Sequence, residues 1–107
     1  MKQSTPVLSP AHHLVTLMLR VRPSFVNRMR VIAHDLGTSS REEDGCLFYF
    51  AAESRETEGF FLIMSAWRDR DAYDLHRKSP YVRAFESQIA PELLRESATL
   101  WSWKKIG

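Results

Sequence analysis

His76 is the residue best suited to chemistry in this sequence, because a neutral imidazole can accept a proton near pH 7. It lies in the segment RDRDAYDLHRKSPY, residues 68–81, with Tyr73 before it and Tyr81 after it. The two phenols can donate hydrogen bonds, so the segment combines a candidate general base with groups that can hold a bound oxygen atom. The same position, between two predicted short helices, also fits a histidine that caps a helix end. The residue types alone leave both interpretations open.

Trp67 and the other histidines are further candidates. Trp67 ends a predicted strand, where it either packs in the core or forms the wall of a pocket for a flat ligand. His12 and His13 precede the first predicted strand and fit a solvated pair, although His13 shares the strand parity of Val15 and can face the helices. His34 lies beside an aspartate in a predicted helix and is expected on the surface.

The sequence carries none of the common motifs for phosphate, metal or disulfide chemistry. Its four glycines form no glycine-rich loop, and it has no CxxC spacing, no HExxH spacing and no Ser-His-Asp order. Cys46, the single cysteine, lies in an apolar run, so we interpret it as a small buried side chain rather than a reactive thiol. We therefore expect neither a metal nor an organic cofactor.

The composition is that of an ordinary globular domain. Lys and Arg total 15 and Asp and Glu total 13, and the net charge of +2 gives no reason to expect nucleic acid or an anionic membrane as a partner. No apolar run is long enough to span a bilayer, and residues 1–12 lack the apolar region of a signal peptide. We expect a cytoplasmic protein with a flexible tail at residues 1–11 and one domain at residues 12–107.

The order of predicted elements indicates an α+β fold. Apolar residues at helical spacing predict a first helix that is capped by Ser24 and ends at Gly37 or near Arg41. Ser79 is the predicted N-cap of a later helix that begins at Pro80. The result is the ferredoxin-like order βαββαβ, with an antiparallel sheet and both main helical segments on one face. The predicted strands span residues 13–22, 46–52, 60–67 and 98–104, and a short helix spans residues 69–78.

The predicted strands are apolar on both faces, although a sheet with helices on one face only should alternate apolar with polar residues. In the third strand, Phe60 and Leu62 lie on one face of the strand and Phe61 lies on the other. In the second strand, Cys46 and Phe48 are predicted to share one face. Leaving the second face in water would expose several side chains, each worth about 1.5–3 kcal/mol when buried. Since the chain has no further element to cover that face, we expect a homodimer with two facing sheets.

In this layout the chain resembles the antibiotic biosynthesis monooxygenase domain, a family of dimeric α+β barrels. The matching pieces are VTLMLRVRP before the first helix, EEDGCLFYF at the first turn and second strand, and AWRDRDAYDLHRKSPYVRAF later. The likeness covers roughly residues 13–103. Its most specific part is the spacing from Trp67 to His76, the Ser-Pro-Tyr run at 79–81 and Phe85.

The resemblance implies a homodimer with one apolar pocket per subunit, between sheet and helices. Family members include cofactor-independent oxygenases of polycyclic anthrones and quinols, enzymes that degrade heme, and relatives that isomerise small phosphorylated diketones. In the oxygenases the substrate loses a phenolic or benzylic proton, and its anion reduces O2. The protein then needs only a base, donors that stabilise the anion, and a dry aromatic pocket.

The chain departs from the family pattern in three respects. The family often has Glu two residues before the tryptophan of the third strand, where this chain has Ser65. The similar anthrone oxygenases carry Asn where this chain has Ile63. The heme degraders need an Asn, a Trp and an axial His, and the matching positions here are Leu17, His76 and Glu86. The resemblance therefore does not extend to heme degradation.

We hypothesise a cofactor-independent monooxygenase that oxidises a small aromatic phenol, quinol or anthrone-type substrate with O2. In it His76 acts as the base or orients the substrate, Tyr73 and Tyr81 donate hydrogen bonds, and Trp67 lines the pocket. One alternative is a non-catalytic dimeric ligand-binding or accessory domain, which the departures in the third strand favour. Another is an isomerase or lyase that uses the same base without O2. The remaining predicted substrate contacts are His13, Leu17, Ile63, Ser65, Phe85 and Glu86.

Overall fold

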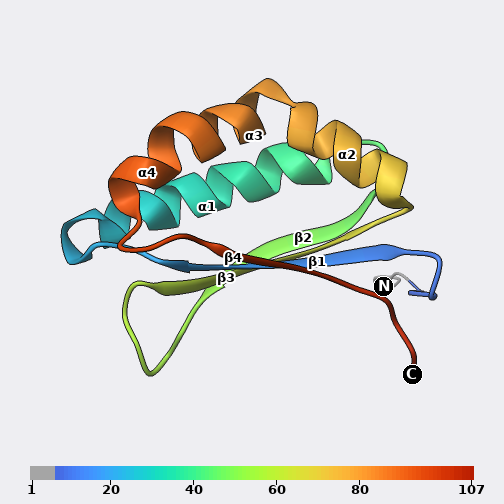
Figure 1. The fold of residues 1–107 in the computed structure, drawn as a ribbon, viewed down its shortest axis with the longest axis horizontal. Helices are drawn as coiled ribbons and strands as arrows, with labels where there is room; N and C mark the ends of the chain where they lie inside the picture. Colours follow the sequence, from blue (N-terminus) through green and yellow to red (C-terminus); the bar gives the residue numbers. More distant parts are fainter. Residues whose placement is uncertain (1–6) are drawn as a thin grey trace, which may run out of the picture.

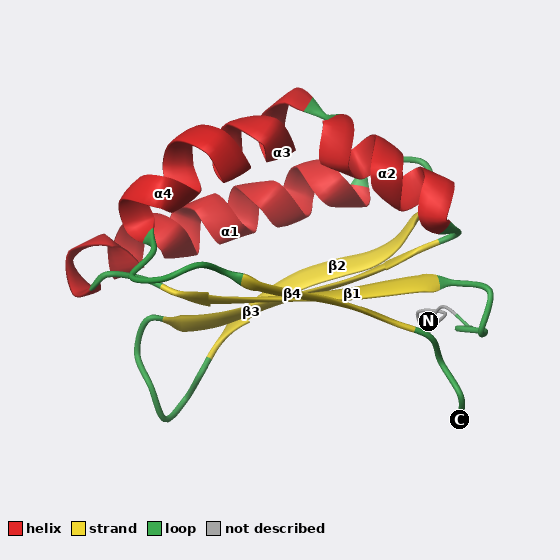
Figure 2. Ribbon diagram, viewed as in Figure 1, coloured by secondary structure: helices red, strands yellow, loops and turns green. Residues whose placement is uncertain are grey.

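The computed structural model describes residues 7–107, which form a four-stranded antiparallel sheet with a layer of helices on one face (Figures 1 and 2). The predicted α+β class and ferredoxin-like order are confirmed. The strands are β1 (His13–Arg20), β2 (Cys46–Glu53), β3 (Phe60–Trp67) and β4 (Thr99–Trp103). The α-helices are α1 (Val26–Arg41), α2 (Arg70–Lys78), α3 (Pro80–Ala84) and α4 (Ala90–Leu93), with a 3-10 turn at Pro23–Phe25 and a π-helical turn at Phe85–Ile89.

The strand order in the sheet is β2-β3-β1-β4, with β3 and β1 in the centre. β1 ends two residues earlier than predicted, because the next two residues bond outside the ladder. The Val21 amide donates to the Gly59 carbonyl and the Arg22 amide donates to the Leu93 carbonyl, both at 2.8 Å. Most of the predicted tail, residues 1–6, lies outside the described residues, and residues 9–12 form a hydrogen-bonded turn before β1. The flexibility of the tail stays a prediction.

α1 begins later than predicted. Pro23 opens a 3-10 turn that includes Ser24, and no side chain caps the N-terminus of α1. The helix continues through Gly37 to Arg41, the longer of the two predicted ends. A glycine suits this point, because a Cβ there would lie 2.8 Å from Nη1 of Arg41, which donates to the Tyr49 carbonyl at 2.8 Å. Among residues 7–107, no helix is long and apolar enough to cross a membrane.

Two polar side chains set the limits of α2. The Asp69 carboxylate accepts a hydrogen bond from the Ala72 amide at 2.8 Å, so Asp69 is the N-cap and the helix starts at the next residue. Ser79 occupies the predicted N-cap position of α3, but its hydroxyl donates to the His76 carbonyl at 2.6 Å and makes no capping bond to α3. The carbonyls in the last turn of a helix lack intrahelical hydrogen-bond donors, and the Ser79 hydroxyl is the donor for one of these carbonyls.

A β-bulge at Leu47 corrects the predicted face of Cys46. Cys46 pairs with Trp67, whereas Phe48 pairs with the residue just before it on β3, so the alternation is interrupted. Cys46 therefore packs against the core on the helix side of the sheet. Burial and then the nearby Glu43 carboxylate raise the pKa of this thiol to about 11, which keeps it protonated and unreactive at neutral pH.

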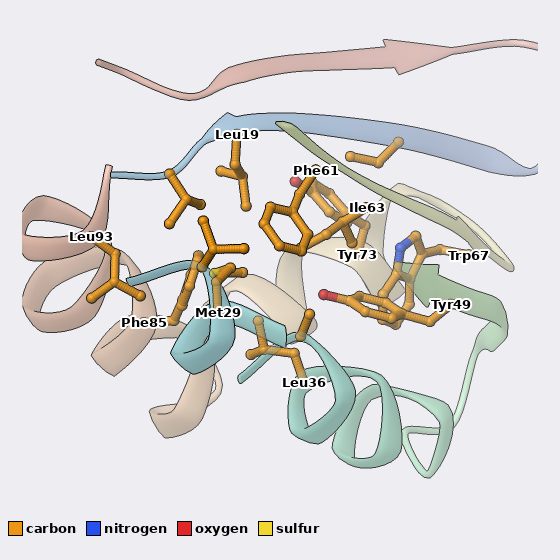
Figure 3. Packing of buried hydrophobic residues seen from close by; sticks show 14 of the residues in the cluster. Leu19, Met29, Leu36, Tyr49, Phe61, Ile63, Trp67, Tyr73, Phe85 and Leu93 are labelled. Carbon is orange, nitrogen blue, oxygen red and sulfur yellow. The ribbon is translucent and has the colours of Figure 1, made fainter. Parts of the chain in front are cut away.

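The core lies between the sheet and the helices (Figure 3). Leu19 of β1 and Phe61 of β3 point toward Met29 of α1, and Trp67 is fully buried at the end of β3. The helical segment after Ser79 also packs inward, through Val82, Phe85 and Leu93, and its middle is the π-helical turn. This packing fixes α2 against the end of β3. The largest fully buried side chains are Trp67, Leu19, Met29, Leu93 and Ser40.

No helix or further strand of residues 7–107 packs over the opposite face of the sheet, which we call the open sheet face (Figure 1). Its apolar side chains come from all four strands, and the exposed fractions are 44% for Phe50, 54% for Trp101 and 51% for Trp103. Contiguous exposed apolar groups of this kind mark an interaction surface. The homodimer inferred from this face stays a prediction. The open sheet face consists of Met18, Phe48, Phe50, Phe60, Leu62, Met64, Trp101 and Trp103.

Replacing Gly45 by alanine is expected to destabilise the fold by about 1–3 kcal/mol. Gly45 has a φ of +90°, and a Cβ there would lie 2.7 Å from the Cβ of Ala72 on α2. The backbone strain and the clash act together at the turn that leads into β2. Urea unfolding followed by circular dichroism measures the loss. Gly107→Ala, where a Cβ meets nothing within 4 Å, is the control, and equal midpoints for the two variants would contradict the prediction.

Candidate functional site

His76 lies in the last turn of α2 and is buried, with an exposed fraction of 6%. Its ring packs against the Trp67 indole, with 4.4 Å between ring centroids. Its Nδ1 lies 2.8 Å from Oε2 of Glu43, which follows α1. The imidazole is therefore held by a carboxylate rather than by the carbonyls at a helix end.

Glu43 is the site residue that the sequence analysis missed. Its carboxylate also accepts a hydrogen bond from the Tyr81 hydroxyl, and Ser40 Oγ lies 3.2 Å from the same hydroxyl. Burial and then the Glu43 carboxylate raise the pKa of Tyr81 to about 12, so the phenol stays protonated as a donor. Glu43 belongs to the EEDG run that supports the family resemblance, and this run was the available signal.

The Glu43–His76 pair determines which ring nitrogen can meet a ligand. A carboxylate at Nδ1 accepts its N–H, orients the ring and stabilises the imidazolium that forms when the other nitrogen takes a proton. Because Nδ1 is bound in this way, Nε2 is the nitrogen left for a molecule beside His76. The arrangement can therefore act as a general base with a fixed direction.

A cavity of about 70 Å³ lies beside His76, between the sheet and the helices. Its wall is mainly apolar and aromatic, with Tyr49 and Leu36 on the side of α1 and Leu100 from β4. Burial raises the pKa of Tyr49, so this phenol is neutral as well. The predicted site residues that line the cavity are Leu17, Ile63, Ser65, Tyr73, His76, Phe85 and Glu86.

Three predicted site residues lie outside the cavity lining. Trp67 is completely buried behind the wall, where its indole packs against the His76 ring. The Tyr81 hydroxyl donates to Glu43, the carboxylate that holds His76, and Tyr81 does not line the cavity. His13 packs against Tyr73 with 5.0 Å between ring centroids and lines an adjoining hollow.

Ser65, the departure from the family pattern in β3, has a structural partner. It is 4% exposed, and its hydroxyl accepts a hydrogen bond from Nε1 of Trp67 at 3.0 Å. The indole N–H is thereby satisfied in the core. Ser65 thus links the cavity wall to the tryptophan that supports His76.

Arg77 lines the cavity and is a second site residue that the sequence analysis missed. Its Nη2 lies 2.7 Å from Oε2 of Glu86, and its Nη1 donates to the Tyr73 hydroxyl at 3.3 Å. Its Nε is buried and has no hydrogen-bond partner in the described part of the chain. Arg77 directly follows His76 on α2, and no periodic pattern marks it. Within residues 7–107, no three His, Cys, Asp or Glu side chains are grouped to hold a metal ion.

The fold and this cavity define the class of protein. The family model for antibiotic biosynthesis monooxygenase matches residues 13–88, which include β1, the Glu43–His76 pair and the helix that follows. The chain therefore belongs to the antibiotic biosynthesis monooxygenase family.

Individual relatives agree with this assignment. The Mycobacterium tuberculosis protein named "Putative monooxygenase Rv0793" is 32% identical over 77 residues, covering 72% of this chain and 75% of its own length. The solved structure of Rv0793 has a TM-score of 0.83 and covers 90% of this chain and 96% of that one, at 27% identity. The Shewanella oneidensis protein SO0527 shares the fold, with a TM-score of 0.85, 18% identity and coverage of 92% and 95%.

A relative from Synechocystis, the uncharacterized protein sll1783, is 29% identical over 86 residues. The match covers 80% of this chain but only 58% of the relative, which is the longer protein.

Proposed function

We propose that this protein is a cofactor-independent monooxygenase that oxidises a small aromatic phenol, quinol or anthrone-type substrate with O2. The observation that carries the proposal is the buried His76, held by the partly buried Glu43 carboxylate, beside a cavity with an apolar and aromatic wall. Membership of the antibiotic biosynthesis monooxygenase family supports the reaction class.

In the proposed reaction, Nε2 of His76 accepts the acidic proton of the substrate, and Glu43 stabilises the resulting imidazolium. The substrate anion gives electrons to O2, and a carbon–oxygen bond forms on the ring or at the benzylic carbon. One oxygen atom stays in the product and the other leaves as water, as when a phenol and O2 yield a quinone and H2O. The substrate supplies all four electrons, so the balance needs no further reductant.

The cavity environment suits this chemistry. Tyr73 lines the cavity and can hydrogen-bond the substrate oxygen, while Leu17, Ile63 and Phe85 exclude water from the anion. Since an open cavity with an oriented histidine is present, a purely accessory role is not favoured. An isomerase or lyase on the same base is the remaining alternative.

The direct test is O2 uptake by the wild-type protein with a panel of naphthoquinols and anthrones. We expect one O2 consumed per substrate, with one atom of ¹⁸O2 in the product and one in water. Added catalase should not change the O2 balance, because no H2O2 is released. Uptake equal to that with heat-denatured protein, or stoichiometric H2O2, would contradict the proposal. Turnover of the panel under argon would indicate the isomerase or lyase instead.

Replacing Tyr81 by phenylalanine is expected to lower stability at pH 7 by about 1–3 kcal/mol, because the partly buried Glu43 carboxylate loses a hydrogen-bond donor. The effect should depend on pH. The folded pKa of Tyr81, about 12, lies above its usual value of 10, so the stabilisation is complete below pH 10 and is lost as the pH rises toward 12. Urea unfolding at pH 8 to 12 should show a steeper decline for the wild type than for Tyr81→Phe. Parallel declines would contradict the prediction.

A further inference from the structure

The cavity beside His76 is too small to enclose a whole aromatic substrate. An apolar cavity of roughly 150 Å³ accommodates benzene, and this cavity measures about 70 Å³. A phenol with its hydroxyl at Nε2 must therefore extend past the wall into an adjoining hollow. Three hollows share wall residues with the cavity. One of about 170 Å³ lies beside β4, one of about 480 Å³ lies beside α4, and one of about 190 Å³ lies beside α1.

The hollow beside β4, which we call the side hollow, is distinguished by its charge. It is lined by His13, Arg70 and Arg77, and it shares Arg77 and Tyr73 with the cavity beside His76. The hollow beside α4 has residues of both charges in its wall, and the hollow beside α1 has an aspartate and no arginine or lysine among the described residues. Among the described residues that line the side hollow, only the two arginines carry a formal charge.

The acidic partners of these arginines do not line the side hollow. Asp74 pairs with Arg70 at 3.0 Å, and Glu86 pairs with Arg77 at 2.7 Å. Both carboxylates are partly exposed, with side-chain exposed fractions of 46% and 42%, so water screens them. A ligand in the side hollow therefore meets the guanidinium groups before their counter-charges.

Arg77 also has an unused donor. Its Nη1 and Nη2 are bound to Tyr73 and Glu86, whereas its buried Nε has no acceptor in the described residues. His13 also lines the side hollow. Burial and then the Arg70 charge lower the pKa of His13, so its imidazole is neutral at pH 7. A neutral imidazole still has one N–H to donate. The side hollow thus offers donors without offering a carboxylate.

We propose that the side hollow binds an anionic group of the substrate, and that the substrate is a hydroxylated aromatic carboxylic acid. Its hydroxyl lies at His76 and its carboxylate at Arg77, with Arg70 and His13 in support. A guanidinium and a carboxylate form short, charge-assisted hydrogen bonds, which makes Arg77 a determinant of specificity. This proposal rests on the proposed function, since it names the substrate class of the same site.

The test compares two isosteric probes, 6-hydroxy-2-naphthoic acid and 6-hydroxy-2-naphthamide, by isothermal titration calorimetry at pH 7.5 and low salt. We expect the wild type to bind the acid at least about tenfold more tightly than the amide. Arg77→Gln should reduce this preference to about twofold or less, and Arg70→Gln should reduce it partly. Glu86→Gln should increase the affinity for the acid, because the competing carboxylate is removed. Arg28→Gln, which breaks an exposed Arg28–Glu92 pair outside the cavity lining, should leave both affinities unchanged.

Equal wild-type affinity for the two probes, or no binding of either at 1 mM, would overturn the proposal. So would an Arg77→Gln variant that weakens both probes equally. The outcome is separable from that of the proposed function. If the protein oxidises neutral quinols but does not prefer the acid, the anion site is contradicted and the monooxygenase is supported. If it binds the acid selectively but takes up no O2, the anion site is supported and the monooxygenase is contradicted.

Discussion

Replacing His76 by glutamine is expected to lower kcat for quinol-dependent O2 uptake by about 10²–10⁴-fold. The amide of glutamine can still donate a hydrogen bond to Glu43, so the partly buried carboxylate keeps this partner. It cannot accept the substrate proton, which is the step assigned to Nε2. Because the change removes the base and preserves the contact, the loss should fall on kcat more than on KM. Oxygen-electrode kinetics with the best substrate of the panel measure both constants.

His34→Gln is the matched control for this variant. His34 is an exposed histidine on α1 whose Nδ1 lies 3.7 Å from a neighbouring aspartate, so it has an acidic partner as His76 does but is remote from the cavity lining. The control should retain wild-type kinetics. Thermal unfolding by circular dichroism should show both variants folded. If His76→Gln is folded and turns over the substrate at the wild-type rate, His76 has no part in the mechanism.

The wild-type protein is expected to sediment as a homodimer at micromolar concentration, with twice the 12.4 kDa mass of one chain. The open sheet face presents apolar side chains from four strands, including two tryptophans that are about half exposed. Burying such a face against a second copy removes it from water, and a twofold arrangement lets one surface cover itself. We propose this homodimer as the form in which the cavity works.

Replacing Met64 by lysine is expected to weaken that dimer by more than about 100-fold. Met64 is in a central strand on the open sheet face, so the twofold symmetry places two unpaired ammonium groups in one apolar interface. Sedimentation equilibrium from 1 to 50 µM should then show the monomer mass.

Val31→Lys provides the comparison for Met64→Lys. Val31 is an exposed apolar residue on α1, in the helix layer, with an exposed fraction of 63%. This variant should remain a dimer, which separates the open sheet face from exposed apolar residues in general. A wild-type protein that sediments only at 12.4 kDa would contradict the proposed dimer.

Strand periodicity was sufficient to predict the architecture. The family resemblance pointed to Leu17, Ile63 and Ser65 as site positions, and the structure finds all three in the cavity wall. The bounds of β3 were predicted at both ends. The architecture and the strand bounds follow from local chemistry. Successive side chains of a strand point to opposite faces, so the positions of the apolar residues indicate which face is buried.

Contacts between distant segments could not be predicted in this way. Glu43 and His76 are 33 positions apart, and neither residue interrupts a periodic pattern that would mark the pair. Cys46 changed faces because one bulged residue shifted the strand parity, which composition does not encode. Trp67 and Tyr81 were assigned to the pocket by residue type, but packing placed one behind the wall and turned the other toward Glu43.

One physical cause separates the features that the sequence predicts from those that only the tertiary structure determines. Side-chain periodicity reports which face of an element avoids water, and that was enough for the order of strands and helices and for the apolar open sheet face. The partner of a particular polar atom depends instead on where turns and helix ends meet in space. Only the folded chain brings the turn after α1 against the end of α2, and the oriented base exists because of that contact.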